Sequence, residues 1–186
     1  MPLRALFAGT GAVSPAAGSA LSLALRAVFA VSVLPFLLAS AATKFDGFGL
    51  SDQAYFLILP QYMEAVAYDP AAIGWPWRLW VALGSGAEVA LPLALVAGLA
   101  TRWAALAMIG FLAVMSVTEV WFHGVPDAVV GAWFDADPYA LILDQRLMWC
   151  ALLVVLAVLG GGRVSVDAWL RARRATRQAR HSQPTL

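Results

Sequence analysis

Residues 79–122 read LWVALGSGAEVALPLALVAGLA, then TR, then WAALAMIGFLAVMSVTEVWF. Each apolar run has roughly the 20 residues that an α-helix needs to cross the ~30 Å hydrocarbon core of a bilayer. Only Thr101 and Arg102 separate the two runs. The sequence therefore predicts two membrane-spanning helices, over about 79–100 and 103–122, that form a tight antiparallel hairpin.

Two further stretches are long and apolar enough to span a membrane, over about 21–43 and 139–160. The first is longer than the apolar region of a cleavable signal peptide, and Pro35 is expected to bend it near its middle. The last is interrupted in its first turns by Asp144-Gln145-Arg146. The expected fold class is all-α, a polytopic membrane four-helix bundle. Its domain at 21–162 lies between an N-terminal segment (1–20) and a basic tail (163–186).

The composition agrees with a lipid environment. The chain has 186 residues, of which 62% are hydrophobic and 12% charged, whereas a soluble domain carries about 25% charged residues. This excludes an ordinary soluble enzyme and makes the lipid bilayer the expected surroundings. The net charge of +1 gives no reason to expect a nucleic-acid partner. Cys150 is the single cysteine, so no intrachain disulfide forms, and we expect it to be a small buried residue.

The charged residues are distributed unevenly between the two sides of the predicted bundle. One side has Lys44 and Arg78 against seven acidic residues, whereas the other has eight arginines against Asp167. Because cationic loops are retained in the cytoplasm, we expect both termini there and the acidic loops outside a bacterial cytoplasmic (inner) membrane. The eight arginines are Arg4, Arg102, Arg163, Arg171, Arg173, Arg174, Arg177 and Arg180.

Two segments outside the spans have patterns of their own. The apolar stretch Tyr55–Pro60 is too short to cross a bilayer, so we expect it to lie on the membrane surface or to fold back over the bundle. The tail after Gly160–Gly162 predicts a short interfacial helix followed by an arginine-rich end. Anionic lipid would attract such a tail; the alternative is a solvated tail that only fixes topology.

Glu88 is the clearest candidate for a functional residue inside the membrane. It lies about nine residues, or roughly 13 Å, from the outer end of its helix, where an ionisable group is costly. Pro92 cannot donate to the Glu88 carbonyl, and the small residues around Ser85 allow a close neighbour. We expect a pocket for a ligand or a proton formed by Glu88, Arg26, Ser85 and Pro92, with the acid neutral. Alternatively, Glu88 only ties its helix to Arg26 or to a backbone group. Arg26 lies close enough to the inner end of its helix to reach the headgroups.

A second candidate region lies near the outer surface. Met115, Glu119 and His123 follow each other at intervals of four residues, which puts them on one helical stripe. They are weak candidates for a soft metal such as copper, because two histidines cannot build a conventional metal site and methionine stripes are usually packing. We also expect an outer polar cluster; its alternative is a set of ion pairs that fix helix ends. The cluster comprises Lys44, Asp46, Glu119, His123, Asp144 and Arg146.

The stretch 86–105, GAEVALPLALVAGLATRWAA, resembles the DoxX family of small four-helix bacterial membrane proteins. The membrane glutamate, the leucine-rich helix and the cytoplasmic hairpin with Thr101-Arg102 carry the resemblance, which extends over about residues 21–170. It implicates Glu88, together with Arg26, Lys44 and Arg102. Some members are subunits of a thiosulfate:quinone oxidoreductase and others belong to oxidative-stress complexes. A further group accompanies bufferin-type copper-binding peptides.

These observations lead to two hypotheses of different classes. The first is a DoxX-like membrane subunit of a redox or stress-response system that binds quinone near Glu88, with no cofactor motif of its own in the chain. The second is a non-enzymatic scaffold or small transporter in copper homeostasis. Both are compatible with a periplasmic or membrane protein partner and with a homo-oligomer.

Overall fold

The computed structural model describes residues 14–181, and their side chains as far as residue 178. Most of the predicted N-terminal segment, including Arg4, and the last five residues lie outside the described residues. Four helical segments are long and apolar enough to cross a membrane. These are Pro15–Ser32, Trp75–Ala97, Thr101–Phe122 and Leu141–Leu159. The expected all-α four-helix membrane bundle is thereby confirmed.

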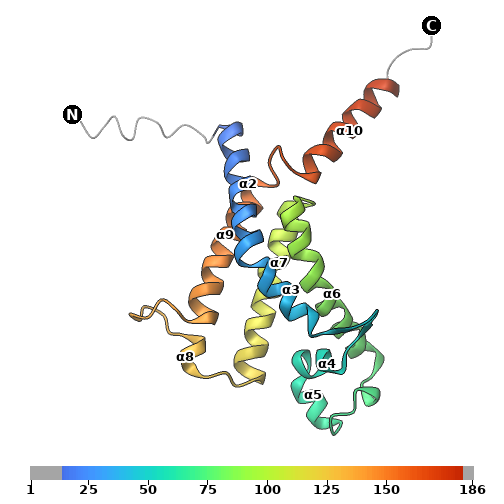
Figure 1. Ribbon diagram of the computed structural model, residues 1–186, viewed down its shortest axis with the longest axis vertical. Helices are drawn as coiled ribbons and strands as arrows, with labels where there is room; N and C mark the ends of the chain where they lie inside the picture. The colour runs from blue at the N-terminus through green and yellow to red at the C-terminus, as the bar shows by residue number, and fades with distance from the viewer. Residues whose placement is uncertain (1–13, 182–186) are drawn as a thin grey trace.

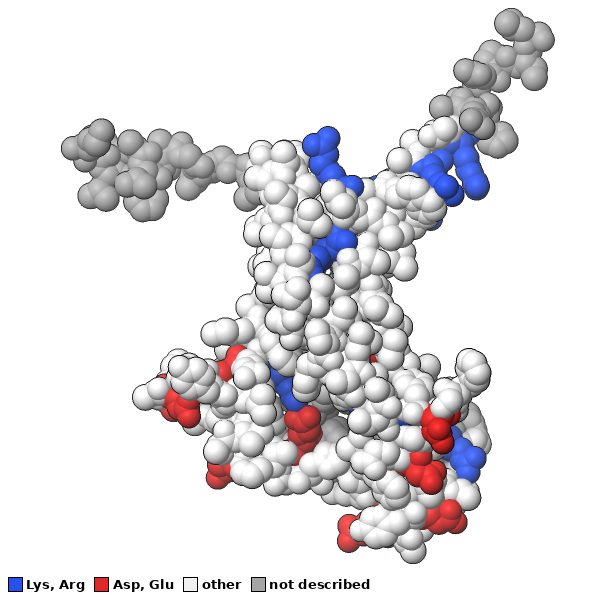
Figure 2. Space-filling model, viewed as in Figure 1, with Lys and Arg blue, Asp and Glu red and all other residues white. Residues whose placement is uncertain are grey.

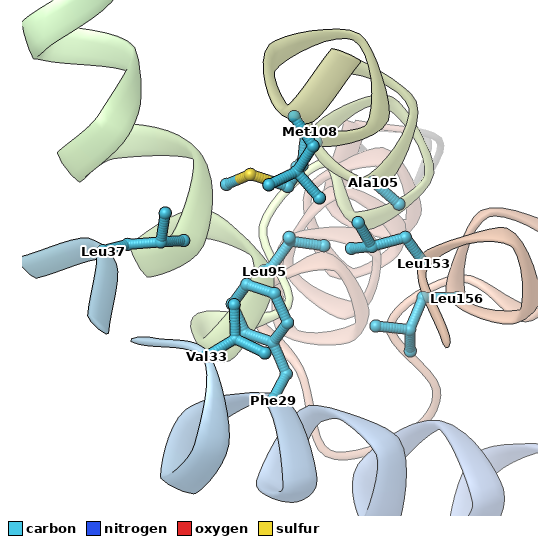
Figure 3. Packing of buried hydrophobic residues seen from close by; sticks show 10 residues of the cluster. Phe29, Val33, Leu37, Leu95, Ala105, Met108, Leu153 and Leu156 are labelled. Carbon is cyan, nitrogen blue, oxygen red and sulfur yellow. The ribbon is translucent and has the colours of Figure 1, made fainter. Parts of the chain in front are cut away.

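Each spanning helix packs against two others, so that the four form a closed ring of contacts. Figure 1 shows them from the side. Helix α2 (Pro15–Ser32) contacts both α6 (Trp75–Ala97) and α9 (Arg146–Leu159), and α7 (Thr101–Val117) contacts the same two helices from the other side. Ten buried apolar side chains fill the centre (Figure 3). They are Phe29, Val33, Leu37, Leu95, Ala104, Ala105, Met108, Leu112, Leu153 and Leu156.

The first span starts earlier than expected and is broken in the middle. Helix α2 begins at Pro15 because the Ser14 side chain accepts from the Ala17 N–H at 3.2 Å and proline is favoured at the first helical position. It ends at Ser32, and α3 (Leu34–Ala42) continues the chain beyond Val33. Pro35 lacks the N–H that would bond the carbonyl four residues earlier. The predicted bend is therefore confirmed.

The turn between the second and third spans lies three residues before its predicted position. Helix α6 ends at Ala97, and Gly98 adopts φ +70°, which glycine tolerates without steric cost. The Leu99 N–H then bonds the Ala94 carbonyl at 2.8 Å. The tight hairpin is confirmed, but Thr101 lies in the first turn of α7 instead of in the connection.

The loop between the first and second spans folds back over the bundle, which decides between the two expected arrangements. It also contains a two-stranded antiparallel hairpin that the sequence did not predict. Ala54, Leu59 and Met63 are buried against Val81 of α6 and form a second, smaller core. The elements are β1 (Phe45–Asp46), β2 (Gly49–Leu50), α4 (Asp52–Ile58), α5 (Pro60–Ala65) and the 3-10 turn η1 (Pro70–Ala72).

Two spans are wound more widely at the end that carries this loop. Helix α7 passes into a π-helical turn η2 (Thr118–Phe122), and α9 is preceded by another, η3 (Leu141–Gln145). The short helix α8 (Asp127–Val130) packs against η3 in the loop that joins them. The polar residues that interrupt the last span thus lie where its helix begins.

At the opposite end, helix α10 (Val166–His181) is held against the α6–α7 turn and then extends away from the bundle (Figure 1). The Asp167 carboxylate accepts from the Ala100 N–H at 2.7 Å, from the Thr101 N–H at 3.0 Å and from the Thr101 hydroxyl at 2.9 Å. The Asp167 N–H donates to the Gly98 carbonyl at 3.0 Å. The predicted tail helix is present, but tail arginines such as Arg171 and Arg177 lie within it instead of following it.

Because Asp167 links two elements far apart in sequence, its titration should affect stability. Burial raises the pKa of Asp167, but the bonds from Thr101 and Ala100 outweigh burial, so this pKa lies below its ordinary value. A lowered pKa contributes stability that is complete above the ordinary value and is lost as pH falls through the folded-state value. We expect Asp167→Asn to cost about 0.5–2 kcal/mol of unfolding free energy at pH 7, as the loss of a helix cap does.

This prediction is checked by thermal unfolding of the detergent-solubilised protein between pH 7 and pH 3. The difference between wild type and Asp167→Asn should shrink as the pH falls below about 4. Asp46→Asn, at an exposed position on β1, is the control and should change little. A difference that is constant over this pH range would contradict the role of the ionised carboxylate.

Candidate functional site

The central polar feature of the bundle is an ion pair between Lys44 and Glu88. The Lys44 ammonium lies 2.7 Å from Oε2 of Glu88, and the two residues are only 7% and 1% exposed. Glu88 comes from the middle of α6, whereas Lys44 follows the end of α3. An ionised group inside lipid is costly unless it has a partner, so this contact favours the carboxylate and not the neutral acid that we expected.

This pairing was not predicted from the sequence. From its position in the chain, Lys44 was expected in the outer cluster, and Arg26 was considered as the partner of Glu88. Lys44 reaches inward because its ammonium donates to the hydroxyl of Ser40 at 2.9 Å and to the Ser40 carbonyl at 3.3 Å, one helical turn deeper. The backbone of a lysine can thus lie near a helix end while its charge lies well inside.

Arg26 has a different role at the other end of α6. Its guanidinium donates to the carbonyl oxygens of Leu95 and Val96, the closest contact being 2.6 Å. It also donates to the Gly161 carbonyl at 3.0 Å and to that of Val164 at 2.6 Å. The last carbonyls of a helix have no partner within it, so Arg26 caps α6. The structure therefore does not bring Arg26 to Glu88, but places its guanidinium at the opposite end of α6.

A cavity of about 560 Å³ lies beside the ion pair, within the range of small-molecule sites. Helices α6 and α7 form its walls, and α4 and the end of α3 close it. Most of the lining is apolar, as with Leu91 and Phe111. Its polar residues are Ser40, Lys44, Glu88, Thr118, Glu119 and His123. The structure thus brings Glu88 and half of the predicted outer cluster to one site.

Two acceptor positions on this wall have no protein partner among the described residues. Oε1 of Glu88 is buried and makes no hydrogen bond, and Oε2 has only the ammonium of Lys44. Nε2 of His123 lies 2.9 Å from the Leu57 carbonyl. Because a carbonyl only accepts, Nε2 carries a hydrogen, and in the neutral ring Nδ1 keeps its lone pair. The polar part of the cavity therefore offers free acceptors, among them a buried carboxylate oxygen, to the donor groups of a ligand.

The other residues predicted for the Glu88 pocket are buried in α6 but do not line the cavity. The hydroxyl of Ser85 has no hydrogen-bond partner among the described residues, and α6 continues through Pro92 without ending. Both residues belong to the packed side of the helix.

The rest of the outer cluster fixes helix ends. Arg146, 6% exposed, pairs with Glu119 and donates to the Ser116 hydroxyl at 2.8 Å, which ties the start of α9 to α7. Asp144 accepts from the Ala140 N–H at 2.9 Å at the start of η3, and Asp46 is exposed on β1. For Asp144 and Arg146 the structural alternative is therefore the better interpretation.

Met115, Glu119 and His123 do lie together on the cavity wall, but two of them are already engaged. Glu119 is neutralised by Arg146, and one ring nitrogen of His123 is bound to Leu57. Among residues 14–181, no group of three or more His, Cys, Asp or Glu side chains is arranged to hold a metal ion. This arrangement suits an organic ligand better than a metal.

Thr101 and Arg102 lie at the end of the bundle opposite the cavity. Thr101 is part of the contact with Asp167, and Arg102 is exposed beside Gly160, where a Cβ atom would lie 3.2 Å from the arginine Nε. The residues implicated by the family resemblance therefore separate into two places. Lys44 and Glu88 lie at the cavity, and Arg26 and Arg102 at the other end.

Comparison with known proteins agrees with this geometry. The family model described as DoxX matches residues 21–124, a region that contains Arg26, Lys44, Glu88 and the α6–α7 hairpin. A search of curated proteins gave no match. A search of solved structures gave none either. With more than half of its length matched by the family model, the chain belongs to the DoxX family.

Proposed function

We propose that this DoxX-family protein binds an isoprenoid quinone, preferentially as the quinol, in the cavity beside Lys44 and Glu88. It would do so as the membrane subunit of a redox or stress-response system. The observation that carries the proposal is the combination of an apolar cavity of about 560 Å³ with a buried ion pair on its wall.

The surroundings of the cavity favour a ligand that arrives through the bilayer. Three side chains that line it are also exposed on the lipid-facing surface, with Trp80 50%, Leu83 61% and Val114 51% exposed. A water-soluble metabolite would have no reason to cross this apolar border. A ligand that combines a ring with a polar edge and an isoprenoid chain can bind both regions: the ring edge contacts the polar wall of the cavity, and the chain passes its apolar border.

The free acceptors favour the reduced form of such a ring. A quinone headgroup only accepts hydrogen bonds, whereas a quinol has two hydroxyl groups that donate. The Lys44 ammonium is already engaged by Ser40 and Glu88, while Oε1 of Glu88 has no partner. A hydroxyl donating to this carboxylate would form a charge-assisted hydrogen bond, which is stronger than a neutral one.

Electron transfer would require a second protein. The chain contains no recognisable cofactor-binding motif and a single cysteine, so electrons from a bound quinol would have to pass to a carrier on a partner. The contribution of this chain would be to bind and orient the ring and to hold a proton acceptor near it.

The proposal is tested by measuring the affinity of decylubiquinol and of decylubiquinone for the detergent-solubilised protein under anaerobic conditions. Wild type should bind the quinol about tenfold more tightly, since a hydrogen bond to a charged group contributes roughly 1.5–3 kcal/mol. Glu88→Gln and Glu88→Ala should abolish this preference, and Glu64→Gln, an exposed acid of α5, should keep it. Unchanged binding in both Glu88 variants, with normal folding, would remove Glu88 from the site.

The stability of the ion pair provides a second test. Removing one partner of a buried pair leaves an uncompensated charge and costs about 3–5 kcal/mol, whereas replacing both by apolar residues is close to neutral. We expect Lys44→Met and Glu88→Leu each to lower the unfolding temperature, and the double variant to recover most of the loss. The folded double variant should still fail to prefer the quinol. Additive losses in the double variant would show that the two side chains do not stabilise each other.

The proposal also includes an orientation, with the arginine-rich end in the cytoplasm. Figure 2 supports it, because many of the Lys and Arg side chains visible there gather at the α10 end and the visible Asp and Glu side chains gather toward the opposite end. A green fluorescent protein fused after residue 186 should fluoresce, and an alkaline phosphatase fused there should be inactive. An active phosphatase would reverse the topology.

A further inference from the structure

A second, polar groove lies at the end of the bundle opposite the cavity. It has a volume of about 720 Å³ and is lined by the start of α7, the glycine loop after α9 and the start of α10. Three exposed arginines border it, Arg102, Arg163 and Arg171. Figure 1 shows why they meet, since α10 leaves the bundle beside the α6–α7 turn.

The positive charge in this groove is only partly compensated by the protein, since Asp167 attracts Arg171 electrostatically without forming an ion pair with it. Among the side chains that the structure describes, none of the three arginines forms an ion pair or a hydrogen bond with another residue. Asp167 is the acid in the groove, and its carboxylate already accepts three hydrogen bonds from Ala100 and Thr101. Three guanidinium groups therefore face one carboxylate that is engaged elsewhere.

Backbone donors add to this excess. The N–H groups of Gly161, Gly162 and Arg163 donate no hydrogen bond within the described residues. The loop that carries them is held rigidly, since its carbonyl at Gly161 is bonded by Arg26 and a Cβ on Gly161 would lie 2.6 Å from the hydroxyl of Thr101. The groove thus offers both charged and neutral donors on a fixed frame, the combination that suits a phosphate group.

The groove lies at the ends of the spanning helices, at the depth expected for lipid headgroups. It lies where α9 ends and α7 begins, next to Trp103, which is 76% exposed and lines it together with Leu159. The exposed side chains of Val164, just before α10, and of Trp169 on α10 lie close by in sequence. Tryptophan prefers the interface between lipid and water. A phosphate bound by the arginines would therefore have room for acyl chains along the apolar side of the same groove.

We propose that this groove binds the phosphate of an anionic phospholipid from the leaflet at the α10 end, with Arg102, Arg163 and Arg171 as its ligands. The site is separate from the quinol cavity and does not rest on the proposed function. Bound lipid would join α7, the glycine loop and α10, and so secure the position of α10 on the membrane.

The test is native mass spectrometry of the full chain in a mild detergent, titrated with dioleoyl phosphatidylglycerol or dioleoyl phosphatidylcholine. Wild type should retain one phosphatidylglycerol with an affinity at least about tenfold higher than for phosphatidylcholine, since each arginine near an anionic surface contributes roughly 1 kcal/mol. The triple variant Arg102→Gln/Arg163→Gln/Arg171→Gln should lose this preference.

The matched control also removes three positive charges, all from α10, without touching the groove. Arg173→Gln/Arg174→Gln/Arg177→Gln should keep the phosphatidylglycerol preference, because none of these residues lines the groove. If both triple variants lose the preference equally, the attraction is a general effect of the basic helix, and the site is refuted. A wild type without preference would refute it as well.

Two further measurements keep the result interpretable. Inorganic phosphate at 10 mM should not displace the lipid; displacement would identify a site for soluble phosphate instead of phospholipid. Thermal unfolding should show that the groove variant is folded. If it is not, the single variant Arg171→Gln, on an exposed helix face, should still weaken phosphatidylglycerol binding more than Arg174→Gln does, and equal effects would overturn the proposal.

Discussion

The buried contact between Lys44 and Glu88 constrains the arrangement of the helices around it. A carboxylate in the middle of a span needs a partner that can reach it from the interface, and a long side chain at the end of another helix meets that need. The break at Val33 allows α3 to have a direction of its own and to bring Lys44 to α6. The β-hairpin and α4 then follow directly and close the cavity beside the pair. One electrostatic requirement thus accounts for the position of three segments that are not themselves spanning helices.

The opposite end of the bundle satisfies a buried charge through hydrogen bonds to carbonyl oxygens and without an ion pair. Arg26 is surrounded by carbonyl oxygens at the end of α6 and in the glycine loop, where the last carbonyls of a helix need donors from outside it. Asp167 shows the reverse arrangement: a carboxylate accepts hydrogen bonds from backbone amide groups at the start of α7. Both residues connect helix ends, and such contacts use up their hydrogen-bonding capacity. This is why they stabilise the fold, whereas Glu88 keeps a free oxygen for a ligand.

The spans could be predicted from the sequence because their length is set by the thickness of the bilayer and their composition by its polarity. The contacts between them could not. The prediction located Lys44 by the position of its backbone near the helix end. Its side chain of four methylene groups, however, extends inward and brings the ammonium to Ser40 and Glu88. The hairpin turn was predicted at Thr101-Arg102 because these are the polar residues between the two apolar runs. In the structure α6 ends earlier, because Gly98 can adopt the positive φ that ends the helix. Asp167 is about 66 residues from its partners, and no local pattern indicates such a contact.

The choice between an organic ligand and a metal follows from the hydrogen-bonding capacity that remains in the cavity. Residues of the right types for copper are present, but Arg146 occupies Glu119 and the Leu57 carbonyl occupies one nitrogen of His123. A metal bound to Glu119 would share this carboxylate with Arg146, a residue only 6% exposed, and the two positive charges would repel each other. A hydroxyl group breaks nothing, because it can donate to Oε1 of Glu88 while Oε2 stays with Lys44. The ion pair can therefore remain intact when a ligand is bound, and this compatibility favours a neutral, ring-shaped lipid over a cation in the same cavity.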